Sequence, residues 1–197
     1  MILAIESSGP VGGAALVEGD AVIAERLVDA PRGRGTALVG LVSELLAMAP
    51  GLERVVVGIG PGSYNGIRGA LALGWGIAAA RDIPLIGLSS LLGFSEERYA
   101  AAGDARRGQY YWARVENGLF IEEPAIFEKA DFERKVAEAA RLPIFLPSPI
   151  EGVDGTVQAA SAAILARRGA MADPAPGVPE PLYLKPAFIN LPGKTGV

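Results

Sequence analysis

Apolar residues along the chain follow two patterns, short uninterrupted runs and longer segments in which they recur every three or four positions. The runs predict buried strands at residues 1–6, 14–17, 21–27, 55–59 and 84–88. The wider spacing covers residues 38–46 and predicts one face of a helix that begins near Thr36, its expected N-cap, and ends before Pro50. This alternation of strands and helices favours an α/β fold.

Residues 58–80, GIGPGSYNGIRGALALGWGIAAA, combine a Pro-Gly turn with a helix rich in small residues. Ser63 or Asn65 is the expected N-cap of this helix. Small residues then recur every four positions and form one ridge, which consists of Gly66, Ala70, Gly74 and Ala78. Each glycine inside a helix costs roughly 0.5 to 1 kcal/mol relative to alanine, so we expect another helix to approach the ridge closely. That helix is either this chain's own, at residues 36–48, or a partner's.

The pattern loosens after residue 93, which divides the chain into a first domain at residues 1–93 and a second at residues 94–197. Asn117 and Gly118 are a strong type I′ hairpin signal between two strand-like runs. The elements predicted for this half are strands at residues 109–116, 119–122 and 144–146 and helices at residues 131–141 and 157–168. Frequent prolines predict a mostly extended end of the chain.

The composition excludes several kinds of site. The 197-residue chain has no cysteine and no histidine, which excludes disulfides, thiolate catalysis, a Ser-His-Asp triad and histidine-based metal sites. Its formal charge of −4 argues against nucleic-acid binding that relies on phosphate neutralisation, and Arg106 with Arg107 is the clearest local basic patch. We find no membrane-spanning run and no signal-peptide pattern, so we expect a cytoplasmic protein without a membrane partner.

Two glycine-rich segments invite comparison with phosphate-binding loops. GIGPGSYNG lacks the spacing of a dinucleotide loop, and no lysine precedes Lys129 to complete a Walker loop. The first hairpin, IESSGPVGGAAL, is similar to the acidic, glycine-rich turn of actin-like and sugar-kinase-like ATPases, with Glu6 and Ser8 as candidate anion contacts. Arg68 is a third candidate. A stand-alone ATPase or sugar-kinase relative that uses the Glu6 loop is therefore the alternative function.

Four segments together carry a family resemblance. In chain order they are ILAIESSGPVGGAALVEGD, VVVGIGPGSYNGIRGALALGWGIAAARDIPLIGLSSL, DARRGQYYWARVENG and PLYLKP. They resemble the successive signatures of the TsaB family, bacterial proteins of tRNA threonylcarbamoyladenosine (t6A) biosynthesis, over residues 1 to about 186. GPGSYNGIRGALALGWGIA and DARRGQYYWA are the most specific parts of the match.

The resemblance implies an actin-like ATPase (ASKHA, ribonuclease-H-like) fold with two related α/β lobes, the second of them reduced. It also implies a non-catalytic subunit that binds the TsaD-type transferase, the enzyme that modifies adenosine 37 of tRNAs reading codons that start with A. A TsaE-type ATPase would join the complex, tRNA would be met through the complex, and ATP or ADP and metal would belong to the partners.

In that family the two helices after the first hairpin pack against the equivalent helices of TsaD. The resemblance therefore implies a partner surface on these helices, and we expect it to include Leu38, Leu41, Val42, Leu45, Gly66, Ala70, Gly74 and Ala78. Exposed apolar helix faces would also allow a homodimer when the partner is absent. No catalytic residue and no metal ligand is expected in this chain, and peptidase activity is not expected.

Overall fold

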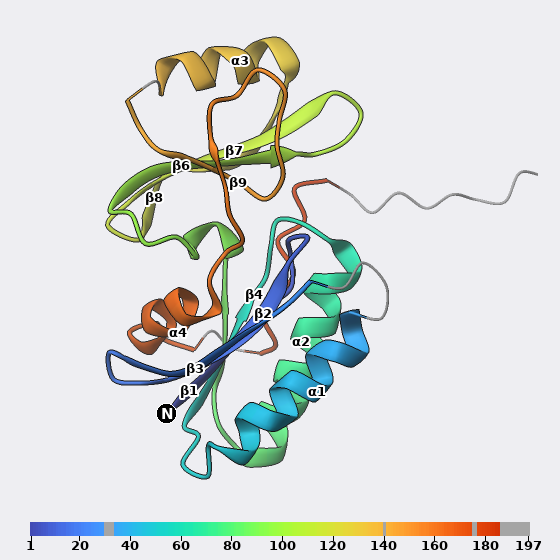
Figure 1. The fold of residues 1–197 in the computed structure, drawn as a ribbon, viewed down its shortest axis with the longest axis vertical. Coiled ribbons are helices and arrows are strands. Elements are labelled where there is room, and N and C mark those ends of the chain that lie inside the picture. The colour runs from blue at the N-terminus through green and yellow to red at the C-terminus, as the bar shows by residue number, and fades with distance from the viewer. Residues whose placement is uncertain (30–33, 140, 175–176, 186–197) are drawn as a thin grey trace, which may run out of the picture.

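The computed structural model describes residues 1–29, 34–139, 141–174 and 177–185. Figure 1 shows two lobes stacked along the long axis, each built on one five-stranded sheet. The strand order is β3-β2-β1-β4-β5 in the first lobe and β10-β9-β6-β7-β8 in the second. The lobes meet near the ends of β1 and β4, where a cavity is lined by residues of both lobes.

The first sheet confirms the strands predicted from the apolar runs. Its members are β1 (Ile2–Glu6), β2 (Gly12–Glu18), β3 (Ala21–Val28), β4 (Arg54–Gly58) and β5 (Leu85–Leu88). β1 runs antiparallel to β2 and parallel to β4, and β2 and β3 form the predicted hairpin. Because the central strands are covered on both faces, β4 is a run of valines that are all fully buried.

Two helices cover one face of this sheet. They are α1 (Arg34–Ala47) and α2 (Tyr64–Arg81). Ser63 is the N-cap of α2, because its side chain accepts a hydrogen bond from the Gly66 amide at 3.2 Å. The alternative cap, Asn65, lies inside the helix. Thr36, the predicted N-cap of α1, also lies inside its helix, which begins two residues earlier than expected.

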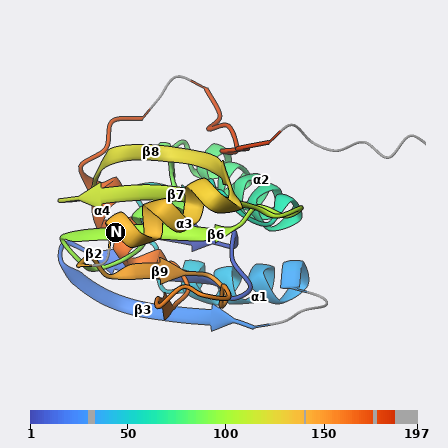
Figure 2. The ribbon, with the colours of Figure 1, turned by 90° about the horizontal axis from the view of Figure 1, so that it is seen from above.

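The second lobe carries its own sheet and, among its described residues, the single α-helix α3 (Lys129–Glu138), as Figure 2 shows from above. The strands are β6 (Arg98–Asp104), β7 (Gln109–Glu116), β8 (Leu119–Glu128), β9 (Ile144–Leu146) and β10 (Thr156–Val157). Asn117 and Gly118 form the predicted tight turn, both with positive φ. β6 was not predicted, and β8 continues past residue 122 to Glu128.

The chain returns to the first lobe through α4 (Ala162–Ala170), which packs on the face of the first sheet opposite α1 and α2. Glu25 of β3 accepts hydrogen bonds from the Ser161 hydroxyl and the Ala163 amide at the start of α4. Arg54 donates to the carbonyl oxygens of Gly169 and Ala172 at its end. A boundary at residue 93 therefore falls between the two sheets. Helix α4, which lies in the range predicted for the second domain, packs on the first lobe.

The predicted helix at residues 157–168 begins late for a local reason. Thr156 and Val157 pair with Phe145 and Leu146 as the edge of the second sheet, so the backbone there is extended. Ser161 then starts α4 by accepting a hydrogen bond from the Ile164 amide at 3.2 Å. The helix is thus shorter than its apolar pattern suggests.

Candidate functional site

The ridge of small residues on α2 lies against the sheet of its own lobe. A Cβ built on Gly74 would come within 2.5 Å of Val57 Cγ2, and one on Gly66 would overlap the carbonyl oxygen of Ser7. Ala70 and Ala78 are buried in the same core. The close neighbours of Gly66 and Gly74 are therefore Ser7 and the β4 valines, and Ala70 and Ala78 share their core with the leucines of α1. The glycines of the ridge are compensated by close packing of α2 on β4.

The predicted partner residues of α1 lie in the same core. Leu38, Leu41, Val42 and Leu45 are 3%, 9%, 1% and 1% exposed. Together with Ala70, Gly74 and Ala78, these side chains face the chain's own core, because a three-to-four apolar pattern marks the face that turns toward the sheet. Gly66 is only half-buried, but its Cα faces the first hairpin.

The outward face of α2 carries a second series of small residues. Ala72, Gly76 and Ala80 are exposed, and a Cβ on Gly69 or Gly76 would meet no atom within 4 Å. Between α2 and α1 lies a shallow groove of about 300 Å³, lined by Leu46, Ala72, Leu73, Gly76, Ile77, Ala80 and Arg81. Val39 of α1 is also 49% exposed. The structure thus leaves a groove lined mainly by small and apolar residues, while Trp75 of α2 is a large side chain that is 54% exposed on the same helix.

The sequence contains a signal for this outward face. Gly69, Ala72, Gly76 and Ala80 recur three or four positions apart, as do the residues of the buried ridge. Helix α2 is therefore small-sided on both faces, and spacing alone does not tell which face the sheet covers. The contact of Gly74 with the neighbouring β4 valines shows which face the sheet covers.

Glu6 lies in the interior at the junction of the lobes. Its carboxylate is 2% exposed and accepts hydrogen bonds from the Ser8 amide at 2.6 Å, the Ser8 hydroxyl at 2.5 Å and the Ser90 hydroxyl at 2.6 Å. The absence of a side chain on Gly58 makes room for it. Burial raises the pKa of the Glu6 carboxyl, and the serine hydrogen bonds oppose that shift.

The assignment of Glu6 and Ser8 as anion contacts is therefore corrected. A buried carboxylate repels an anion, and the Ser8 hydroxyl donates its proton to Glu6. The pair instead ties the end of β1 to Ser90, 84 residues further along the chain, in the connection between the lobes. The role of these hydrogen bonds is therefore structural.

Replacing Glu6 with glutamine is expected to change how stability depends on pH. Because the folded state raises the pKa of this carboxyl above 4.5, its stabilising contribution is complete below that pH and is lost as pH rises through the folded-state pKa. Urea unfolding should give Glu6→Gln a growing advantage over the native chain from acidic to neutral pH. Exposed Glu44, replaced by glutamine, is the matched control. An advantage that shrinks with rising pH would contradict this account of Glu6.

Arg68 is exposed near the start of α2. Its guanidinium donates to the Tyr64 hydroxyl at 2.7 Å and lies 5.1 Å from the centre of the Tyr64 ring. Tyr64 in turn stacks on Tyr183, with 5.1 Å between ring centres. Arg68 therefore belongs to a small aromatic cluster, and its contact with an anion stays a prediction.

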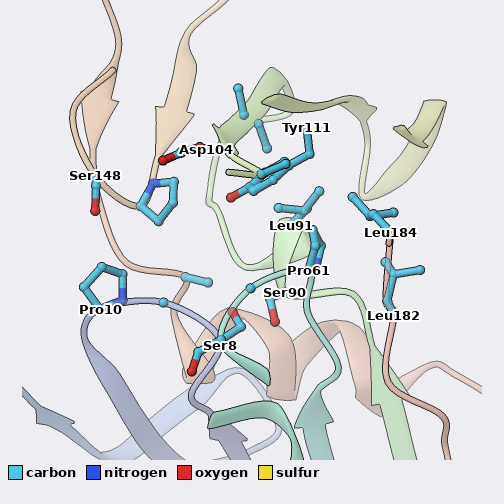
Figure 3. Close-up of a pocket in the computed structure, with 18 of the residues that line it drawn as sticks. Ser8, Pro10, Pro61, Ser90, Leu91, Asp104, Tyr111, Ser148, Leu182 and Leu184 are labelled. Atoms are coloured by element: carbon cyan, nitrogen blue, oxygen red, sulfur yellow. The ribbon is translucent and has the colours of Figure 1, made fainter. Parts of the chain in front are cut away.

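A cavity of about 1050 Å³ separates the lobes. Figure 3 shows Ser8, Pro10 and Pro61 from the first lobe below it, Tyr111 and Asp104 from the second lobe above it, Ser148 on one side and Leu182 and Leu184 on the other. The Tyr111 ring is 7% exposed, and burial raises the pKa of its hydroxyl. The lining is mainly apolar.

Neither a metal cluster nor a membrane span is found in the part of the chain that the structure describes. Its acidic residues form no group of three or more that could hold a metal ion. None of its helices has the length and apolar character to cross a bilayer.

The Arg106–Arg107 patch lies in the turn between β6 and β7, at the rim of the cavity. Both residues have positive φ, 67° and 61°, which is unusual for non-glycine residues. The Asp104 carboxylate accepts a hydrogen bond from the Arg106 amide at 2.6 Å and lies 3.6 Å from the Arg106 guanidinium, so it fixes the turn.

Comparison with known proteins gives one family. The family model described as TsaD, tRNA N6-adenosine threonylcarbamoyltransferase, matches residues 36–151. An uncharacterised protein of Mycobacterium tuberculosis is 32% identical over 67% of each chain. The tRNA threonylcarbamoyladenosine biosynthesis protein TsaB of Bacillus subtilis is 38% identical over 60% of this chain and 57% of its own.

Solved structures show the same fold. A Pseudomonas aeruginosa protein described as similar to the peptidase YeaZ has a TM-score of 0.73 at 23% identity, covering 93% of this chain and 99% of its own. YeaZ from Pseudomonas aeruginosa gives 0.69 at 23% identity, with 86% and 90% covered. The predicted α/β class with two lobes is confirmed, and the fold is that of the two Pseudomonas aeruginosa structures.

Proposed function

We propose a function for this chain from its membership of the TsaB family. It acts in the formation of N6-threonylcarbamoyladenosine at position 37 of tRNAs that read codons starting with A. Its role is that of a non-catalytic subunit that forms a heterodimer with a TsaD-type transferase. The observation that carries the proposal is the exposed, small-sided face of α1 and α2.

This helix surface suits a helical partner for physical reasons. Small side chains let two helix backbones approach closely, and the partly buried Leu46, Leu73 and Ile77 offer apolar area at the floor of the groove. Among the groove residues Arg81 alone is charged, and its guanidinium already donates to the Ala49 carbonyl oxygen at 2.7 Å. A helix pair of the partner would therefore pack on this groove through apolar contacts, and few charged groups would lose their contact with water.

The remaining partners follow from the same proposal. A TsaE-type ATPase joins the complex, tRNA is met through the complex, and nucleotide and metal are held by the partner subunits. Without its partner the chain would pair with a second copy through the same helices. The expected cytoplasmic location stays a prediction.

Size-exclusion chromatography with light scattering tests the partner role. Mixed with the TsaD-type protein of the same organism, the chain should elute in a complex with the mass of a heterodimer or a multiple of it. Separate elution of both proteins, together with magnesium-dependent ATP hydrolysis by this chain alone, would favour the alternative of a stand-alone ATPase. The buried Glu6 argues against that alternative, because its carboxylate is bonded to two serines rather than free for a metal-bound nucleotide.

A further inference from the structure

Residues 179–185, PEPLYLK, form a segment without helix or strand that crosses from the first lobe to the second and is called the strap below. Its lower end lies on the first lobe. Pro179 lies against Gly87 of β5, where a Cβ would come within 2.5 Å of the proline ring, and the Leu182 amide donates to the Ile59 carbonyl oxygen at 2.8 Å. The strap thus begins on the strands that end at the interlobe cavity.

The upper end of the strap is fixed to the second lobe by one ammonium group. Lys185 Nζ donates to the carbonyl oxygens of Ala105 and Arg106 at 2.7 and 3.2 Å. Both carbonyls belong to the β6–β7 turn, whose backbone has positive φ at residues 106–108. Leu184 packs against the apolar cluster of the second lobe. A hydrogen bond from a charged donor is stronger than a neutral one, so Lys185 is the main polar anchor.

The middle of the strap is tied to the start of α2. The ring of Tyr183 stacks on that of Tyr64 with an interplanar angle of 24°. Arg68 holds Tyr64 in place from the next turn of the helix. Tyr183 is nevertheless 41% exposed, so this contact lies at the surface.

The strap is one wall of the interlobe cavity. Figure 3 shows Leu182 and Leu184 on the side opposite Ser148, which belongs to the connection from β9 to α4. That connection and the one through Ser90 hold the lobes together by covalent chain and buried hydrogen bonds. Besides the Leu182 backbone hydrogen bond and the packing of Leu184, the strap is attached by the Tyr183 stack and the Lys185 hydrogen bonds. We propose that residues 179–185 are a displaceable strap that sets how far the two lobes open around the cavity.

Distance measurements by pulsed electron paramagnetic resonance test this directly. The chain has no cysteine, so exposed Ser43 of α1 and Glu138 of α3 can each be replaced by cysteine and spin-labelled. The Tyr183→Ala and Lys185→Met double variant should broaden the distribution or lengthen the mean distance by at least ~2 Å. Glu180→Gln, an exposed change within the strap, should leave the distribution as in the parent.

Tyr64→Leu gives a second test from outside the strap. This substitution removes the Tyr64–Tyr183 stack and the contact of Tyr64 with Arg68, and it leaves the strap sequence intact. It should shift the distance distribution in the same direction as a single Tyr183→Ala variant does. Circular dichroism melts check that each variant is folded. An unchanged distribution in the folded double variant, or an equal change in Glu180→Gln, would overturn the proposal.

Discussion

Replacing Gly76 with tryptophan is expected to weaken binding to the TsaD-type transferase by about 100-fold, or about 2.8 kcal/mol. Gly76 lies in the apolar groove between α1 and α2, and a Cβ there would meet nothing within 4 Å. The indole would therefore project from the surface and hold a partner helix away from the groove. Titration calorimetry with the purified transferase measures the change.

Ala137→Trp is the matched control for this variant. Ala137 is also an exposed small residue in a helix, but it lies on α3 of the second lobe. Its substitution should leave affinity within about twofold of the native value. If both tryptophans weakened binding equally, or if Gly76→Trp bound normally while folded, the partner surface would lie elsewhere.

Replacing Gly58 with alanine is expected to destabilise the protein by about 3 kcal/mol, at the upper end of overpacking effects. A Cβ at this position would overlap Glu6 Oε2 and come within 2.8 Å of Ser90 Oγ. The added methyl group must displace the buried carboxyl and break its hydrogen bond to Ser90. Urea unfolding followed by circular dichroism gives the free energy of unfolding.

Gly40→Ala on α1 provides the comparison for Gly58→Ala. A Cβ on Gly40 meets nothing within 4 Å, so this substitution should raise stability by roughly 0.5 to 1 kcal/mol through helix propensity alone. A Gly58→Ala protein as stable as the native chain would mean that Glu6 does not occupy the space above Gly58.

The strands of the first lobe were predictable because burial on both faces leaves a clear trace in the sequence. The valines of β4 form an uninterrupted apolar run, and the loop between β2 and β3 is short and polar. The N-cap of α2 was also predictable, since Ser63 stands directly before the first helical residue. These are local rules, and local rules suffice where neighbouring residues decide the conformation.

Elements that depend on distant partners were harder to predict. β6 contains three consecutive alanines, which are poor strand formers, and it becomes a strand because β7 and β9 lie on either side of it. The start of α4 depends on Glu25 from β3, and residues 156–157 become a strand only beside β9. The sequence around these segments contains no pattern that indicates those distant contacts.

The residues predicted for the partner site are buried for a related reason. Apolar periodicity identifies the face of a helix that is buried, and the nearest apolar surface for α1 and α2 is the sheet of the same lobe. The face left for a partner is marked by small exposed residues such as Gly69 and Gly76, which carry little apolar signal. Likewise, Glu6 was assigned to anions from its place at the end of the first strand, but its carboxyl group accepts hydrogen bonds from Ser8 and Ser90.

If this chain supports a TsaD-type transferase, threonylcarbamoyladenosine should form in tRNA only when both proteins are present. The most direct measurement reconstitutes the modification of tRNA from purified components with and without this chain, and quantifies the modified nucleoside by mass spectrometry. We expect modification to require the chain. It should fall when the Gly76→Trp variant is used in place of the native chain, and the Ala137→Trp variant should sustain the native level. Equal modification with and without the chain would contradict this expectation.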